Sequence, residues 1–525
     1  MFLFFDTENS GLSKDFSQIY EIAMIATDSK MNMMSSIHLD STRLPWDVPS
    51  PGAMLVTGIM PDVIKKITRT HYEMMRDLNE YIQNQNWPVI FAGYNVYGYD
   101  QGVLSQNMHQ TLQDPFVMTA RRDWQSDANM VFDVLELVRA ASIYAPSVLK
   151  LDIKTPTGLP SMALGNVCRQ NGINLSEEEA HGAFSDTRAT VDLAKKIKND
   201  APHIFMQMLK MANRAEVECF MAENEVFAYS QCPYGTSHSI IGTRITDADG
   251  SKTESVIWDL NVDPAEFANK TDDELVEVFK LWGSSRFETP IQSLQKHKQP
   301  ILMPLDQADG VWPSTLDQGK VKKRLKWIKD NPDFAKRLAK AAKRARPDFT
   351  SGPEPEQQIY DFPDFKIKGA LDQWKAEFHK ADWPEKLKLV GEFKQRFSKD
   401  IAKTPSLKRY MVFALRLVYA NAPELLSDKQ KKQIDAAIHD RRMREGEDVP
   451  YMTIPKAREE LEKIIEERAA GDEKWKHVTD THIRSLKLFY TQLEKEFADI
   501  SKDPANQNDI GAAVNFRKKQ GPNSR

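Results

Sequence analysis

The sequence predicts an α/β fold with a mixed central sheet over its first 200 residues, then a small β-rich region, then a helical region. Three observations predict this order. Apolar runs of strand type alternate with helical patterns up to residue 200. Strand patterns return between residues 225 and 304, and helical periodicity dominates from residue 315 onward. A chain of 525 residues has room for about three domains.

The first 200 residues supply the elements of an α/β domain. Short apolar runs predict strands at residues 2–5, 19–27 and 89–95. Pro61 suits the first turn of a helix over residues 62–67. Further helical patterns cover residues 71–84, a stretch from Gln101, and residues 131–141, 161–171 and 181–197.

The remaining chain divides into three parts. Strand patterns at residues 226–245 and 255–260 flank a hairpin turn at residues 247–250, and residues 290–303 are again of strand type. The last 25 residues lack apolar periodicity, which predicts a disordered tail. We therefore expect domains at residues 1–200, 201–350 and 351–500, with a tail at 501–525.

Composition narrows the setting. Hydrophobic content of 41% and charged content of 28% are typical of a soluble globular protein. The three cysteines have neither metal-ligand spacing nor the number for a disulfide framework, which favours a reducing compartment. Since no leader or membrane span is evident, we expect a cytoplasmic protein with no membrane partner.

Two carboxylates follow the first apolar run. Asp6 and Glu8 are separated by one residue, so an extended backbone places them on the same face. Like charges this close are tolerable mainly around a cation, and carboxylate oxygens are ligands that Mg²⁺ and Mn²⁺ prefer. The alternative is a strand end with two solvated acids.

Two more acids occur where helices begin. Asp100 opens the helix after the strand at 89–95, and Asp186 follows His181 by five residues at the start of another helix. Four acids could hold two divalent ions for phosphoryl transfer, and the histidine could deprotonate the attacking water. Singly, such an aspartate is more often an N-cap, and such a histidine is more often structural.

The ordered pattern Asp-x-Glu, Asp and His-x₄-Asp resembles the DnaQ-like family of 3′→5′ exonucleases, in the subclass with four acids and a histidine. Residues 51–59, 93–100, 158–161 and 296–301, and the segment around Trp327, resemble the bacterial exonuclease I branch of that family over nearly the whole chain. The resemblance implies an RNase H-like exonuclease domain, an SH3-like β domain and a helical domain around a channel for single-stranded DNA.

The resemblance also implies an activity and a set of site residues. It implies a monomeric, single-strand-specific 3′→5′ exodeoxyribonuclease of DNA repair and recombination that releases 5′-mononucleotides. Two Mg²⁺ ions, for which Mn²⁺ may substitute, would be held by Asp6, Glu8, Asp100 and Asp186, with His181 as the base. The residues expected to contact DNA are Glu8, Asn9, Ser10, Phe116, Arg139, Arg214, His297 and Lys298.

Three positions depart from the family pattern. Asn9 and Ser10 stand where the family has threonine and then an aromatic residue or threonine, so packing against the terminal nucleotide is expected to differ. Ala163 stands where an arginine is usual, which removes an expected contact to the terminal phosphate. The four acids and His181 are all present.

A basic run lies between residues 320 and 346. It contains twelve Lys or Arg residues against two Asp, with Trp312 and Trp327 as apolar anchors. Such a field attracts an acidic partner, either DNA or, as the resemblance implies, the acidic C-terminal tail of single-strand DNA-binding protein. A solvated helix face is the alternative.

Three other functions fit parts of the sequence. An exoribonuclease of the same superfamily should lack the large β and helical extensions. A non-catalytic single-strand-binding protein should have lost an acid or the histidine. A proofreading subunit of a polymerase should lack the long C-terminal region.

Overall fold

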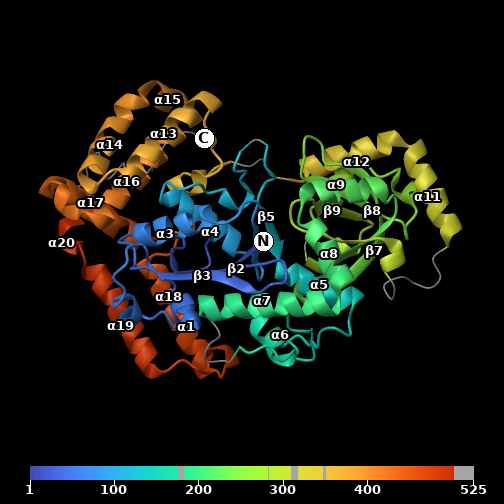
Figure 1. Cartoon of the computed structure of the whole chain (residues 1–525), viewed down its shortest axis with the longest axis horizontal. Helices are drawn as coiled ribbons and strands as arrows, with labels where there is room; N and C mark the ends of the chain where they lie inside the picture. Colours follow the sequence, from blue (N-terminus) through green and yellow to red (C-terminus); the bar gives the residue numbers. More distant parts are fainter. Residues whose placement is uncertain (124, 176–181, 282, 309–316, 347–349, 502–525) are drawn as a thin grey trace.

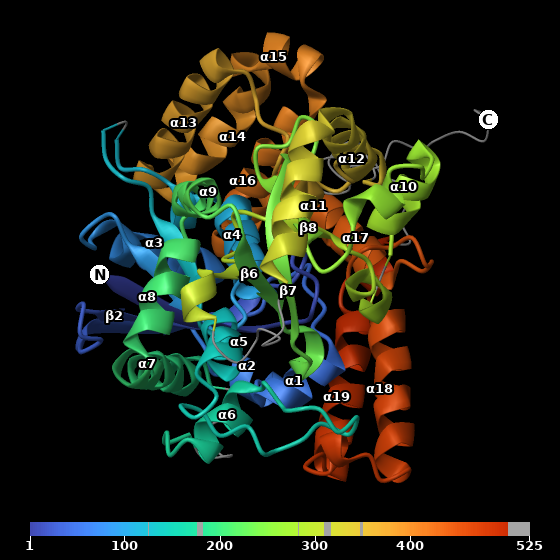
Figure 2. The same cartoon turned by 90° about the vertical axis from the view of Figure 1, so that its right-hand side faces the viewer.

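A computed structural model of the protein describes residues 1–123, 125–175, 182–281, 283–308, 317–346 and 350–501. The N-terminal region lies at the centre of the molecule, with a second sheet and its helices on one side and a helical region on the other (Figure 1). The view turned by 90° shows the long helices α18 and α19 packed side by side (Figure 2).

The first sheet has five strands in the order β3-β2-β1-β4-β5. The strand β1 is central, because it pairs antiparallel with β2 on one side and parallel with β4 on the other. Its apolar residues fill the core on both faces. The strands are β1 (Phe2–Asn9), β2 (Ile19–Thr27), β3 (Met33–Asp40), β4 (Ile90–Gly93) and β5 (Met130–Asp133).

The close approach of β4 to β1 requires a glycine. A Cβ atom on Gly93 would lie 2.9 Å from the carbonyl oxygen of Phe5, which is closer than side chains tolerate. The strand β4 ends at Gly93, and the chain then leads to the helix that begins at Asp100.

Helices cover this sheet, and α7 packs against β1 and β2. A capping box at Thr70 and Glu73 fixes the start of α3. The helices are α1 (Pro51–Thr57), α2 (Pro61–Ile64), α3 (His71–Gln83), α4 (Asp100–Gln110), α5 (Val134–Tyr144), α6 (Leu164–Gln170) and α7 (Ala183–Asp200).

Two expectations for local structure were wrong. The apolar pattern of residues 131–141 is a short strand, β5, followed directly by helix α5, because Asp133 ends the strand and caps the helix through the backbone N–H of Leu135. The strand β3 was not predicted, because most of its residues are exposed and lack an apolar pattern. In addition, β1 continues through Asp6 and Glu8 rather than ending before them.

The second sheet is antiparallel and has the order β10-β6-β7-β8-β9. Its strands are β6 (Phe227–Gln231), β7 (His238–Asp247), β8 (Glu254–Asp259), β9 (Ile291–Gln295) and β10 (Ile301–Met303). The neighbouring helices are α8 (Pro202–Met211), α9 (Arg214–Glu223), α10 (Asp272–Phe279), α11 (Gln318–Asp330) and α12 (Pro332–Arg344).

The C-terminal region is helical throughout its described residues. It contains α13 (Phe365–Lys380), α14 (Trp383–Arg396), α15 (Ser398–Lys403), α16 (Lys408–Asn421), α17 (Asp428–Met443), α18 (Ile454–Ala469), α19 (Asp480–Lys495) and α20 (Ala498–Ser501). The expected fold class, an α/β region followed by a β-rich and a helical region, is confirmed. The expected tail lies outside the described residues from 502 onward, and the domain boundaries stay a prediction.

The three regions share hydrophobic cores. Trp46 and Tyr72 of the first region belong to the same core as helices α13, α14 and α16, and Tyr20 packs with residues of α18 and α19. Ile301 and Met303 of the second sheet join the core beneath β1. The sheets and helices therefore hold one another in place. No described helix combines the length and the apolar character that crossing a membrane requires.

A buried ion-pair network stabilises the helical region. The carboxylate of Glu356 accepts hydrogen bonds from Arg416 at 2.8 Å and from Arg441 at 2.9 Å, and all three side chains are at most 4% exposed. Burial pushes the pKa of Glu356 up, and the two arginines more than offset this, so its pKa lies below its ordinary value.

Replacement of Glu356 by Ala should lower the free energy of unfolding by about 3–5 kcal/mol, because it removes the buried carboxylate that Arg416 and Arg441 share. Guanidinium unfolding followed by tryptophan fluorescence measures the change. Because the pKa of Glu356 is lowered on folding, its stabilising contribution is present above about pH 4.5 and is lost as the pH falls through the folded-state value. Glu385→Ala, which breaks an exposed pair with Lys388, is the control and should change stability by about 0.5 kcal/mol or less.

Candidate active site

Three carboxylates meet beside the central strand. Asp6 and Glu8 lie on β1, and Asp186 lies in the first turn of α7, which packs across that strand. Each of the three offers an oxygen atom, and these atoms all lie within 4.8 Å of one another. A β-bulge follows Glu8, where the pairing with β2 shifts register. Such bulges re-aim side chains at the ends of strands.

The fourth acid, Asp100, is the first residue of α4 and is held from β1. Its Oδ1 accepts a hydrogen bond from the hydroxyl of Thr7 at 2.6 Å. The side-chain amide of Asn9 in turn donates to the Thr7 hydroxyl at 2.9 Å. All three residues are buried. Asn9, expected to contact DNA, thus lies in a chain of hydrogen bonds that ends at Asp100.

The electrostatics of this site reflect burial and like charge together. Burial raises the pKa of Asp6 well above its ordinary value, and Asp100, Glu8 and Asp186 raise it further. Burial, then the charges of Asp186 and Glu21, raise the pKa of Glu8 to about 9. Burial also raises the pKa of Asp100, to about 6, although the hydrogen bond from Thr7 opposes the shift. The carboxylates therefore repel one another strongly when ionised.

This donor set fits divalent cations. Mg²⁺ and Mn²⁺ take oxygen ligands, and a positive charge between these carboxylates would favour the ionised forms that burial and mutual repulsion oppose. Asp6, Glu8 and Asp186 are placed to share one ion. Asp100 acts on Asp6 as its strongest charged neighbour and approaches the same site from α4.

His181 lies outside the described residues, two positions before the start of α7. The structure describes Ala183 onward, so it fixes the helix that carries Asp186 and leaves the histidine unplaced. Of the expected site residues, the structure brings Asp6, Glu8 and Asp186 together, and it places Asp100 at the start of α4, where its charge acts on Asp6.

A cavity beside α4 is lined by two of the expected DNA contacts. Its volume is about 540 Å³, and Gln101, the residue after Asp100, is among its lining residues. Arg214, at the start of α9, and His297, in the loop after β9, also line it, as does Arg121. Lys298 is exposed. Burial lowers the pKa of Lys14, and the nearby charge of Lys298 lowers the pKa of Lys14 further.

Phe116 lies in an aromatic cluster at the boundary with the helical region. Its ring centroid is 5.5 Å from that of Phe362 and 6.0 Å from that of Tyr360. Phe362 is 64% exposed and Tyr360 is 55% exposed, so the cluster faces solvent. The sequence analysis missed these two partners. Their signal was available as two aromatic residues in a short polar segment just before α13. The neighbouring Trp124 lies outside the described residues.

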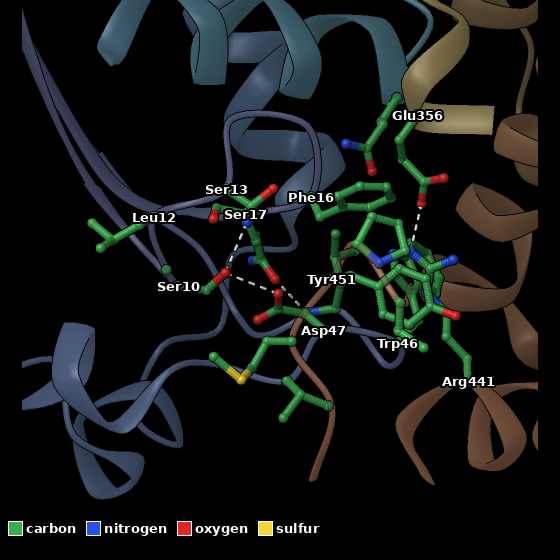
Figure 3. A pocket seen from close by; sticks show the side chains of 18 of the residues that line it. Ser10, Leu12, Ser13, Phe16, Ser17, Trp46, Asp47, Glu356, Arg441 and Tyr451 are labelled. Carbon is green, nitrogen blue, oxygen red and sulfur yellow. Dashed lines mark hydrogen bonds and ion pairs between the residues drawn. The ribbon is translucent and has the colours of Figure 1, made fainter. Parts of the chain in front are cut away.

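Ser10 and Arg139 are both engaged within the protein. The Ser10 hydroxyl donates to Asp47 at 2.9 Å and accepts from the backbone N–H of Gln18 at 2.9 Å. It lines a pocket of about 270 Å³ between the loop after β1 and the helical region, opposite Tyr451 and Arg441 (Figure 3). Arg139 on α5 donates to Glu136 at 2.5 Å. Ala163 is the N-cap of α6 and offers no cation.

The basic run forms α11 and α12, and most of its cations face acids of the same region. Ion pairs join Lys326 to Asp330, Lys329 to Glu225, Lys336 to Asp333, Arg337 to Asp272, Lys343 to Asp249, Arg344 to Asp273 and Arg346 to Glu254. Trp327 packs on Phe334, and Trp312 lies outside the described residues. The exposed lysines at the start of α11 are Lys320, Lys322 and Lys323.

Comparison with known proteins agrees with this geometry. The family model described as RNase_T, exonuclease, matches residues 3–194, which include every acid of the site. The N-terminal region is therefore similar to the exonuclease domains that this model describes. The expected resemblance to DnaQ-like exonucleases is thereby confirmed.

Relatives and solved structures extend the similarity beyond the exonuclease domain. Exodeoxyribonuclease I of Buchnera aphidicola from Schizaphis graminum is 29% identical over 43% of this chain and 45% of its own length. That of Escherichia coli K12 is 23% identical over 69% of this chain and 76% of its own. The chain thus spans about half the length of the Buchnera relative.

Two solved structures share the fold over 94% of this chain and 99% of theirs. One is Exonuclease I from Methylocaldum szegediense, with a TM-score of 0.73 and 18% identity. The other is E. coli Exonuclease I in complex with a dA16 oligonucleotide, with a TM-score of 0.71 and 18% identity. The arrangement of both sheets and the helical region therefore has precedents.

Replacement of Thr7 by Val should weaken Mn²⁺ binding by about 10- to 100-fold, because Asp100 loses the hydroxyl that donates a hydrogen bond to it. Loss of a hydrogen-bond partner of a metal ligand typically lowers metal affinity by this factor. Titration of the protein with Mn²⁺, followed by electron paramagnetic resonance of the free ion, measures the affinity. Thr7→Ser keeps the hydroxyl and is the control. Equal affinity of Thr7→Val and wild type would contradict a positioning role for this hydrogen bond.

Proposed function

We propose that the protein is a divalent-metal-dependent 3′→5′ exodeoxyribonuclease that degrades single-stranded DNA to 5′-mononucleotides. The observation that carries the proposal is the convergence of Asp6, Glu8 and Asp186 within 4.8 Å, with Asp100 behind them. The exonuclease domain supports hydrolysis of a phosphodiester bond. The resemblance to exonuclease I supports DNA as the substrate.

In this proposal the four acids hold two Mg²⁺ ions, and Mn²⁺ can replace them. When bound, such ions lower the pKa of a water molecule and offset negative charge on the leaving oxygen. Asp6, Glu8, Asp100 and Asp186 fix the position of the reacting phosphate by fixing the charges around it. His181 accepts the proton of the attacking water, and the terminal 3′ nucleotide leaves with its 5′-phosphate.

Single-strand preference follows from two features of the surface. Arg121 and Arg214, which line the same cavity as His297, supply cations for the phosphate backbone. The aromatic cluster of Phe116, Tyr360 and Phe362 supplies exposed rings on which unpaired bases can stack. We still expect DNA contacts at Glu8, Lys298, Asn9, Ser10 and Arg139. The last three also make the hydrogen bonds within the protein that are described above.

A partner other than DNA is also part of the proposal. The exposed lysines Lys320, Lys322 and Lys323 form a basic patch on α11, a helix at the outer side of the second sheet (Figure 1). We assign this patch to the acidic tail of single-strand DNA-binding protein rather than to the DNA strand in the active site, and the protein acts as a monomer.

Two rival functions are separated by substrate and by turnover. A non-catalytic binding protein would bind a DNA oligomer without shortening it, and the four retained acids argue against it. An exoribonuclease would shorten a matched RNA oligomer in preference to DNA, whereas we expect the DNA to be preferred.

Digestion of a 5′-labelled single-stranded DNA oligomer with Mg²⁺ should give a ladder that shortens from the 3′ end. Asp186→Asn should slow it by about 10³-fold or more, the scale seen when a member of a catalytic unit is removed. EDTA should abolish digestion by the wild type. Asp192→Asn, an exposed acid on the same helix α7, is the matched control and should leave the rate unchanged. Tight binding of the oligomer by wild type without digestion would contradict the proposal.

Replacement of Phe362 by Ala should weaken binding of a single-stranded DNA oligomer by about 1–3 kcal/mol, because one stacking surface is lost. Fluorescence anisotropy of a labelled oligomer in EDTA measures this without digestion. Leu488→Ala, which truncates an exposed apolar side chain on α19, is the control. If the two variants bind equally well, the aromatic cluster does not contact the strand.

A further inference from the structure

Glu21 is an acid beside the carboxylate site that the proposed chemistry does not use. It lies on β2, directly opposite Glu8 on β1 and Asp40 on β3. Directly opposite residues of antiparallel strands project from the same face of the sheet, where like charges are destabilising. Its position in a row of three acids therefore requires partners that offset its charge.

Those partners come from β3 and from the start of α7. The Oε1 atom of Glu21 lies 2.8 Å from Nε2 of His38, and it accepts a hydrogen bond from the backbone N–H of Ala183 at 3.0 Å. The ring of His38 also lies 5.8 Å from that of Phe184, measured between centroids. The hydrogen bond to Glu21 raises the pKa of His38, which favours its charged form. Glu21 and His38 thus both contact the first turn of α7.

This turn depends on an acceptor from elsewhere in the fold. The first N–H groups of a helix lack partners within the helix, and the N-cap of α7 is Gly182, which has no side chain to supply one. The carboxylate of Glu21 supplies it instead, with the negative charge that a helix N-terminus favours. Asp186 lies in the same turn, and its backbone N–H donates to the carbonyl of Gly182 at 3.1 Å. The place of Asp186 is therefore set by how this turn is anchored.

We propose that Glu21 and His38 form a clamp that anchors the first turn of α7 to the sheet and so holds Asp186 against Asp6 and Glu8. This inference rests on the proposed function of those three acids as ligands of a divalent ion. Glu21 is a positioning residue, because it acts through Ala183 and the helix turn that carries Asp186.

The test is Mn²⁺ binding to the full-length protein without DNA, measured by electron paramagnetic resonance of the free ion. Glu21→Ala should weaken Mn²⁺ binding by about 10- to 100-fold, as loss of a partner behind a metal ligand does. It should lower kcat on single-stranded DNA and leave KM for the oligomer unchanged. Glu21→Gln keeps an oxygen that can accept from Ala183 and should restore most of the Mn²⁺ affinity.

Asp40→Asn is the matched control, because it removes one negative charge from the same row and contacts Arg69 rather than α7. It should bind Mn²⁺ as the wild type does. His38→Phe keeps a ring beside Phe184 and removes the donor, so it should give a smaller loss than Glu21→Ala in the same direction. This variant also carries the test if Glu21→Ala does not fold.

Either of two results would overturn the clamp: wild-type Mn²⁺ affinity in Glu21→Ala and His38→Phe, or an equal loss in Asp40→Asn. The latter would mean that net charge alone matters. A wild type that binds Mn²⁺ and does not shorten DNA would instead contradict the proposed function, and the comparison of Mn²⁺ affinities would still test the clamp.

Discussion

Mutual repulsion among buried carboxylates beside the central strand is the constraint on which the arrangement of this protein depends. Asp6 and Glu8 lie on β1, and the pairing of β1 with β2 and with β4 holds their backbone in place. Asp100 and Asp186 arrive on helices packed against that strand. Ionised acids at these distances raise one another's pKa and oppose folding. A fold that keeps them together needs rigid support around them, and either a bound proton or a bound cation offsets their charge.

That support comes from neighbouring side chains on β1 and β2. Thr7 and Asn9 hold Asp100 from β1, and Glu21 holds the start of α7 from β2. Behind them, shared cores join the first sheet to the helical region and to the second sheet. Because each element that carries one of these acids is packed against another, small changes at a distance are expected to reach the carboxylates through rigid elements rather than through the loops.

The sequence predicted some parts of this fold better than others, for physical reasons. The strand β2 was predicted at its observed bounds, because its apolar run is buried on both faces. The strand β3 was missed, because edge strands with exposed residues carry no apolar pattern. The segment 131–141 was predicted as one helix. Its strand, β5, has only four residues, which are too few to show the alternating pattern of a strand before helix α5 begins.

By itself, the sequence indicated a carboxylate site for divalent ions, since the order Asp-x-Glu, Asp and Asp at predicted strand and helix ends is typical of such sites. Their arrangement was decided by the tertiary structure. Only packing of α7 across β1 brings Asp186, 178 residues after Glu8 in the sequence, within 4.8 Å of that residue. Likewise, no sequence pattern distinguishes Glu21, and the sequence around Tyr360 does not show that Phe116 lies beside it. Their roles arise from neighbours that come close only when distant segments pack together.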